Sequence, residues 1–158
     1  MFTFHEIIDL AIRIEQNGET AYRKAQNEVL NPLLTPMLQR LADDEKEHIK
    51  WFEAFRNRVG AVDIHPELEE IGKSMLQGVL GDQAFSIQEA DFSKIDDLQT
   101  LLELSLEFEK DTILFYEMLS AFVTDSETLE QLETIIQEET NHVRILEEWL
   151  NKGINHDI

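Results

Sequence analysis

The stretch LQRLADDEKEHIKWFEAF, residues 38–55, sets two polar side chains in the middle of an otherwise apolar helix face. Positions that return to one side of a helix follow steps of three and four residues, and here they are Leu38, Leu41, Glu45, His48, Phe52 and Phe55. A carboxylate buried without a partner costs several kcal/mol or takes up a proton. The pattern therefore predicts a compensating partner for Glu45 and His48, and a metal ion is the natural candidate.

The same pattern recurs towards the C-terminus, on the face formed by Leu132, Ile135, Glu139, His142, Leu146 and Trp149. An offset of 94 residues (139 − 45) superimposes four distinctive pairs without a gap: Glu15 on Glu109, Tyr22 on Tyr116, Glu45 on Glu139 and His48 on His142. Such a repeat predicts one helix hairpin used twice about an approximate twofold axis. The two hairpins would bring four glutamates and two histidines together in the core of a bundle.

The length of the chain fits a single domain, residues 1–158. Glycine (6) and proline (3) are scarce, and this composition favours an all-α fold. We predict a four-helix bundle in which two antiparallel hairpins, at about 3–59 and 96–150, are joined by a long crossover at 60–95. This crossover would make the second and third long helices parallel. Thr35 and Pro36 are expected as N-cap and first residue of the second helix. The helices are predicted at about 3–30, 36–59, 96–123 and 127–150, with a short one at 66–77.

The formal net charge of −20 at pH 7 argues against nucleic acids and anionic membranes as partners, since both attract Lys and Arg side chains. No apolar run approaches the ~20 residues that cross a bilayer. The first residues lack the basic, apolar and small-residue pattern of a secretion signal. We therefore expect a soluble, cytoplasmic protein.

The chain contains no cysteine. This excludes disulfides, zinc–thiolate sites, thiol nucleophiles and iron–sulfur or rubredoxin-type centres within the given sequence. A redox reaction would therefore need electrons from a separate donor.

Glutamate and histidine in this arrangement suit a pair of metal ions. Glu45 and His48, three residues apart on a helix, can offer an oxygen and a nitrogen to one ion, and Glu139 and His142 can do the same. Four carboxylates balance two divalent ions, whereas without metal they would repel one another and some would take up protons. Carboxylate and imidazole ligands without thiolate favour two iron ions, with manganese as the alternative. The metal-free alternative is a bundle whose buried polar groups only hydrogen-bond one another.

Two further acids are related by the same offset. Asp44 and Glu138 directly precede the glutamates of the two Glu-x-x-His pairs. Each could accept the free imidazole N–H of the histidine in the other hairpin and so fix its tautomer. The alternative is that both are ordinary exposed acids of a helix.

The first and third helices carry three more residues of interest. Tyr22 lies two turns from Glu15 on the same helix face, and Tyr116 lies two turns from Glu109. Gly18 is unfavourable inside a helix by ~1 kcal/mol relative to alanine. It would leave room for peroxide or dioxygen, or it would allow close helix packing.

Four segments resemble the ferritin-like diiron carboxylate superfamily and, within it, the rubrerythrin-like branch. They are IEQNGETAY (14–22), DEKEH (44–48), EKDTILFY (109–116) and EETNH (138–142). The resemblance covers both hairpins and implies a ferritin-like four-helix bundle. It implies Glu45 and Glu139 as bridging ligands, with Tyr22 and Tyr116 as catalytic hydrogen-bond donors beside the site. The full set of iron ligands it implies is Glu15, Glu45, His48, Glu109, Glu139 and His142.

This chain departs from rubrerythrins proper in two ways. They add a C-terminal rubredoxin domain, which the cysteine-free sequence lacks, so the resemblance implies an external electron donor such as a rubredoxin-like protein. They also carry a further glutamate three residues after the ligand of the third helix, where this chain has Thr112. Glu19, one turn from Glu15, could substitute for it or could be a surface acid.

The leading functional hypothesis is an oxidoreductase of the peroxidase type, in which a diferrous site reduces hydrogen peroxide or activates dioxygen. Three alternatives stay open. One is an iron-binding protein that acts as a ferroxidase or an iron buffer. The others are a diiron oxygenase acting on a small organic substrate and a helical interaction module with a degenerate site. Homodimers are common among the proteins that this chain resembles.

Overall fold

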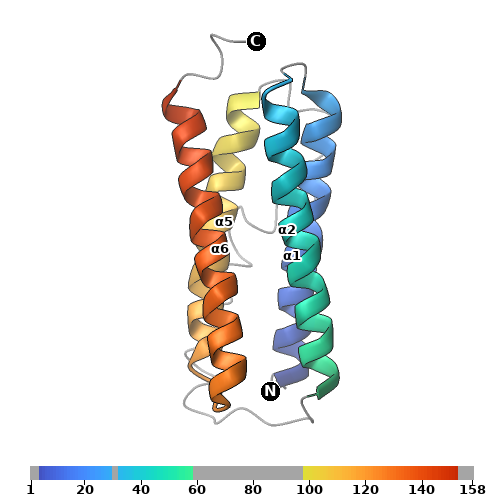
Figure 1. The fold of residues 1–158 in the computed structure, drawn as a ribbon, viewed down its shortest axis with the longest axis vertical. Helices are drawn as coiled ribbons and strands as arrows, with labels where there is room; N and C mark the ends of the chain where they lie inside the picture. The colour runs from blue at the N-terminus through green and yellow to red at the C-terminus, as the bar shows by residue number, and fades with distance from the viewer. Residues whose placement is uncertain (1–3, 30–31, 59–97, 153–158) are drawn as a thin grey trace.

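Four long helices make up the described part of the computed structural model, and they form two antiparallel hairpins (Figure 1). The described residues are 4–29, 32–58 and 98–152. The first hairpin consists of α1 (Phe4–Glu28) and α2 (Leu34–Arg58), and the second of α5 (Leu98–Ser120) and α6 (Ser126–Asn151). Since these residues contain no strand, the prediction of an all-α, four-helix fold is confirmed.

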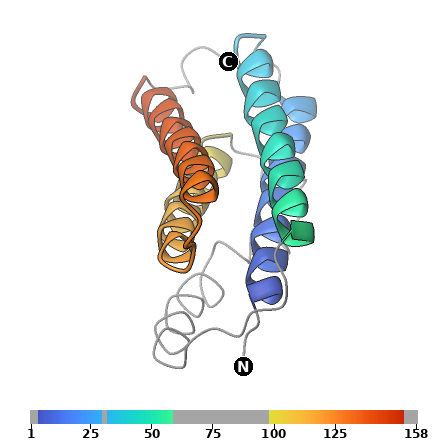
Figure 2. The same ribbon diagram turned by 60° about the horizontal axis from the view of Figure 1, so that its bottom comes forward.

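The direction of the helices agrees with the predicted connection. α2 and α5 run in the same direction, and α1 and α6 run opposite to them (Figures 1 and 2). Within each hairpin the two helices pack along one another. The predicted crossover at 60–95, with its short helix at 66–77, lies outside the described residues.

The turn between α5 and α6 differs from the prediction at one end. α5 ends at Ser120 rather than near Val123. The next three amides donate to carbonyls three residues earlier, over 3.0–3.2 Å. Such bonds tighten the last turn of a helix and satisfy carbonyl groups that would otherwise lack partners. Asp125 then caps α6, because its side chain accepts the amide N–H of Thr128 at 2.9 Å.

The other helix ends lie close to the predicted ones. α1 ends at Glu28, two residues before the predicted end. α2 begins at Leu34, so Thr35 lies inside the helix and not at the predicted N-cap. Pro36 becomes the third helical residue. It is tolerated there because the first four amide positions of a helix have no carbonyl partner within it.

Apolar side chains fill the space between the helices on both sides of a polar layer. The spacing of three and four residues in the sequence predicts an inner face for each helix. The predicted inner positions that are buried include Ile8, Ala11, Ala25, Leu38, Leu41, Phe52, Leu102, Leu119, Leu132 and Leu146. The buried face of α5 is wider than predicted, because it also includes Ser105, Phe108, Thr112 and Phe115. The same spacing also predicts Leu106 and Val123 as inner residues, but both are only partly buried. A helix in a bundle packs against more than one neighbour, and this broadens its buried stripe.

Candidate metal centre

Six polar side chains form a layer across the middle of the helices, and none is more than 2% exposed. We call them the six-residue cluster. They are Glu15 of α1, Glu45 and His48 of α2, Glu109 of α5, and Glu139 and His142 of α6. The long single helices fix their positions, since each Glu-x-x-His pair lies on neighbouring turns of one helix. The structure therefore brings all six predicted ligand residues together.

The cluster contains two overlapping groups of possible ligands. One consists of Glu15, Glu45, His48 and Glu139, and the other of Glu45, Glu109, Glu139 and His142. Within each group, one ligand atom from every residue lies within 4.8 Å of the others. Glu45 and Glu139 belong to both groups. Each group could hold one metal ion, with the two shared carboxylates placed to bridge the ions.

Internal hydrogen bonding does not satisfy this cluster. Nδ1 of His142 lies 3.0 Å from Oε1 of Glu45 and 3.0 Å from Oε2 of Glu139, but it makes no hydrogen bond to either. Two ligand atoms at right angles on one ion, each ~2.1 Å away from it, would be about 3 Å apart. Buried polar atoms without partners are rare in proteins, and a bound cation would satisfy them. Those in the cluster are Glu15 Oε2, Glu45 Oε1, Glu109 Oε2, Glu139 Oε2 and His142 Nδ1.

Both histidines are oriented by an acid of the opposite hairpin. Nε2 of His48 lies 2.6 Å from Oε2 of Glu138, and Nε2 of His142 lies 3.0 Å from Oδ2 of Asp44. The hydrogen bond with His142 lowers the pKa of Asp44. An Nε2–H donated to an acid leaves Nδ1 with its lone pair directed towards the cluster. The predicted pairing across the twofold axis is therefore confirmed.

Each buried tyrosine donates a hydrogen bond to a glutamate of the other hairpin. The hydroxyl of Tyr22 lies 2.5 Å from Oε1 of Glu109, and the hydroxyl of Tyr116 donates to Oε1 of Glu15. The sequence placed each tyrosine near the glutamate of its own helix and did not predict this exchange. Burial and the neighbouring carboxylates raise the pKa of both tyrosines well above 10. Both phenols therefore keep their protons at neutral pH.

Without metal, like charges crowd the cluster. Burial and the charges of Glu139, Glu15 and Glu109 raise the pKa of Glu45 well above its usual value. Burial and the charge of Glu139 raise the pKa of Glu109 to about 7. Burial also opposes ionisation of Glu15, but the adjacent carboxyl group of Glu45 and imidazole of His48 lower its pKa overall. Burial and mutual repulsion therefore favour protonation of Glu45 and Glu109 in the absence of metal, and two divalent cations would remove the repulsion.

Gly18 lies against the carboxylate of Glu45. A Cβ atom at this position would be 3.1 Å from Oε2 of Glu45, closer than most side chains tolerate. The absence of a side chain at Gly18 therefore allows the carboxylate of Glu45 to lie close to α1. Of the two predicted roles for this glycine, the geometry supports close packing.

Thr112, which stands where rubrerythrins proper carry a further glutamate, and Glu19, the possible substitute for that glutamate, both stay out of the cluster's hydrogen bonds. The hydroxyl of Thr112 donates to the carbonyl of Phe108 at 2.8 Å, one turn back along α5. The carboxylate of Glu19 pairs with Arg23 at 2.9 Å, and Arg23 also pairs with Asp43. Glu19 therefore fits the prediction of a surface acid.

The Rubrerythrin family model matches residues 6–150 of this chain. The chain belongs to the rubrerythrin family. The matched segment contains all six residues of the cluster, both tyrosines and both acids that orient the histidines. The resemblance predicted from the four short segments is thereby confirmed at the level of the family.

A solved structure supports the fold of this rubrerythrin-family chain. It is a crystal structure from Thermotoga maritima whose description places it among ferritin-like diiron-carboxylate proteins. The two chains align with a TM-score of 0.70 over 95% of each, at 22% sequence identity. None of the curated proteins compared with this chain matches it significantly. The fold is therefore that of a ferritin-like bundle, as predicted.

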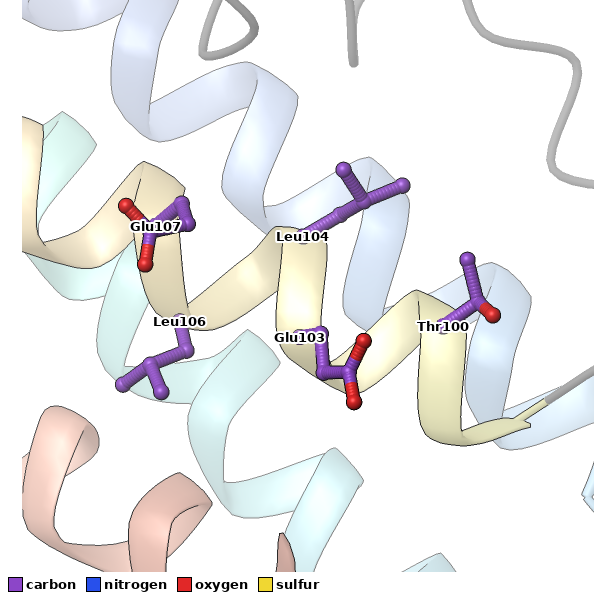
Figure 3. A pocket seen from close by; sticks show the side chains of 5 residues that line it. All are labelled: Thr100, Glu103, Leu104, Leu106 and Glu107. Carbon is purple, nitrogen blue, oxygen red and sulfur yellow. The ribbon is translucent and has the colours of Figure 1, made fainter.

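One cavity of about 370 Å³ is lined by side chains of α5 (Figure 3). Its lining comprises Thr100, Glu103, Leu104, Leu106 and Glu107. A diiron oxygenase acting on an organic substrate would be favoured by a broad apolar channel that reaches the metal site. None of the residues that line this cavity belongs to the cluster, so this cavity is not such a channel. Among the described residues of this rubrerythrin-family chain, no helix is both long enough and apolar enough to span a membrane.

Proposed function

We propose that this rubrerythrin-family chain is a non-haem diiron redox protein that reduces hydrogen peroxide with electrons from an external donor. The observation that carries the proposal is the pair of buried four-residue groups that share Glu45 and Glu139. Four carboxylates and two neutral imidazoles balance two divalent ions. The donor set favours iron, with manganese as the alternative, because it combines carboxylate and imidazole without thiolate.

Two bound Fe(II) ions would supply the two electrons that, with two protons, convert hydrogen peroxide to two molecules of water. The protein's own contribution is to position the ligands and exclude solvent. Asp44 and Glu138 hold the imidazoles with Nδ1 towards the cluster. Tyr22 and Tyr116 hold the carboxylates of Glu109 and Glu15 and keep their phenolic protons at neutral pH.

An external donor completes the proposed cycle. The sequence has no cysteine and so no thiolate-bound iron centre of its own to return electrons to the site. A small redox protein, such as a rubredoxin-like protein, has the chemistry required. Repeated turnover with such a donor distinguishes this function from iron buffering, in which each ion is oxidised once and held.

An anaerobic Fe(II) titration followed by mixing with oxidant tests the proposal. We expect binding to saturate near two ions per chain and the loaded site to react faster with hydrogen peroxide than with dioxygen. The variant Glu139→Ala removes a carboxylate shared by both groups and should lose the two-ion stoichiometry. Faster oxidation by dioxygen than by peroxide would contradict the peroxidase proposal, and saturation without repeated turnover would favour iron buffering.

A further inference from the structure

Three aromatic rings connect the six-residue cluster with the partly exposed side of α2. The ring centroid of Tyr116 lies 5.1 Å from that of Phe52, which lies 5.0 Å from that of Trp51. Tyr116 is the inner end of this series, because its hydroxyl donates to Glu15 of the cluster. Trp51 is the outer end and is only partly buried. We call the three residues the aromatic path.

The outer end of the aromatic path is held in place. The indole N–H of Trp51 donates to Oε1 of Gln131 on α6 at 2.9 Å. Its ring also stacks on Phe55, with centroids 5.2 Å apart and an interplanar angle of 25°. The indole therefore has a fixed orientation and a polar partner while part of it reaches solvent.

The aromatic path breaks the twofold symmetry of the cluster. Tyr22 and Tyr116 are equivalent under the 94-residue offset, and both donate to a glutamate of the opposite hairpin. The positions equivalent to Trp51 and Phe52 are Ile145 and Leu146, which carry no ring. Among the described residues, no series of ring contacts leads from Tyr22 to a tryptophan. Within the described ranges, one of the two equivalent tyrosines therefore has an aromatic connection towards the surface and the other has none.

We propose that the aromatic path carries electrons from the protein surface to the cluster when dioxygen is the oxidant. The inference rests on the redox function proposed above. Dioxygen needs four electrons and four protons to form two molecules of water, whereas two Fe(II) ions provide two electrons. The other two electrons come from ascorbate, which gives one electron to Trp51 in each of two passes. A pass is the transfer of one electron along the aromatic path.

Each pass moves one electron and returns the protein to its starting state. Tyr116 gives an electron inward, and its phenolic proton passes to Glu15 along the existing hydrogen bond. Trp51 then restores that electron through Phe52, the proton returns to Tyr116, and ascorbate reduces the Trp51 cation radical. Phe52 is not oxidised, because a benzene ring holds its electrons more tightly than indole or phenol. Two passes turn one ascorbic acid into dehydroascorbic acid with release of two protons, and water supplies the other two.

The path can be tested without iron in the full-length chain with Zn(II), which has no redox chemistry. The sequence contains two tryptophans and two tyrosines, so Trp149→Phe leaves Trp51 as the single tryptophan. Azide radicals produced by pulse radiolysis oxidise that tryptophan. Transient absorption then follows conversion of the tryptophan radical to a tyrosine radical, which uses the same electronic coupling as the proposed transfer in reverse.

We expect first-order transfer, independent of protein concentration, in W149F and in the matched control W149F/Y22F. Transfer should be lost in W149F/Y116F and in W51F, which retains Trp149. A general disturbance of packing would affect radical transfer in W149F/Y22F and in W149F/Y116F alike, because the two tyrosines are equivalent in the repeat. Absence of transfer in W149F, or its persistence in W149F/Y116F or W51F, would overturn the proposal.

The two proposals can fail separately. Intact radical transfer in a chain that binds no Fe(II) would reject the proposed function and leave the path as a property of the fold. Normal peroxide reduction in a chain without radical transfer would reject the path alone. Phe52→Leu adds a second check, since loss of the central ring should slow the transfer in the W149F background while circular dichroism reports an unchanged fold.

Discussion

Glu45 contributes an oxygen to both groups of possible ligands, so a small displacement of this side chain affects both proposed ions. Its carboxylate lies against Gly18 of α1, where any larger residue would crowd it. The glycine weakens the helix by ~1 kcal/mol relative to alanine. At this position helix stability and metal binding therefore favour different residues.

Gly18→Ala should separate these two effects. In the metal-free protein the end of the Glu45 side chain can shift by a few tenths of an ångström, so we expect an unchanged or higher Tm. With metal bound, Glu45 is held by the ions and cannot shift, so Co(II) affinity should fall, by roughly the tenfold typical of a disturbed ligand environment. Thermal unfolding and competition with a chromophoric chelator measure the two quantities. A lower Tm with unchanged affinity would contradict this account of Gly18.

The acids that orient the histidines give a second prediction at this scale. Glu138→Ala removes the partner of His48 Nε2, so the imidazole loses its fixed tautomer and orientation. We expect Co(II) affinity to fall about 10–100-fold, as for other residues that hold a metal ligand through a hydrogen bond. Glu133→Ala removes an exposed acid of the same helix and is the matched control. Equal affinities in the two variants would show that Glu138 has no such role.

Among the helices, spacing in the sequence predicted the positions of the site residues better than it predicted helix ends and the width of the core face. Glu45 and His48 could be placed because a rigid helix fixes the relation between residues three apart. The burial of Phe108 and Phe115 depends on which neighbours α5 meets, which its own periodicity does not contain. The pairing of Tyr22 with Glu109 likewise depends on how the two hairpins dock.

The N-cap of α6 gives a prediction for a single helix. Asp125→Ala removes the acceptor of the Thr128 amide, and we expect the Tm to fall by roughly 2–4 °C at neutral pH. Asp125→Asn keeps an acceptor and should lose less. The hydrogen bond from the Thr128 hydroxyl, together with that from the Thr128 amide, lowers the pKa of Asp125. The carboxylate therefore stabilises the fold above pH 3.8, and the difference between wild type and D125A should shrink as the pH falls below that value.

In the whole molecule, a layer of buried charge joins two hairpins that each pack mainly within themselves. The links across this layer include Tyr22 to Glu109, Tyr116 to Glu15, and the two histidines to the opposite acids. The repeat in the sequence predicted this convergence, since it placed the same residue types at equivalent positions along the helices of both hairpins. The form of the connection at 60–95 lies outside the described residues and stays a prediction.

Metal binding should therefore stabilise the whole bundle. At a free Co(II) concentration 100 times its measured Kd, binding should raise the free energy of unfolding by ~2.7 kcal/mol per site. Differential scanning calorimetry of the metal-free and loaded chains measures the change. Glu45→Ala, which removes a ligand from both groups, is the control and should show a much smaller shift. A bound ion that leaves the Tm unchanged would place the ion outside the interface between the hairpins.

The central claim is that two metal ions lie between the hairpins and share Glu45 and Glu139. Anomalous diffraction at the iron absorption edge, from crystals grown with Fe(II) under anaerobic conditions, tests it most directly. The account predicts two peaks about 3.5–4 Å apart, one beside Glu15 and His48 and the other beside Glu109 and His142. An empty cluster, or iron found only on the acidic surface, would contradict it.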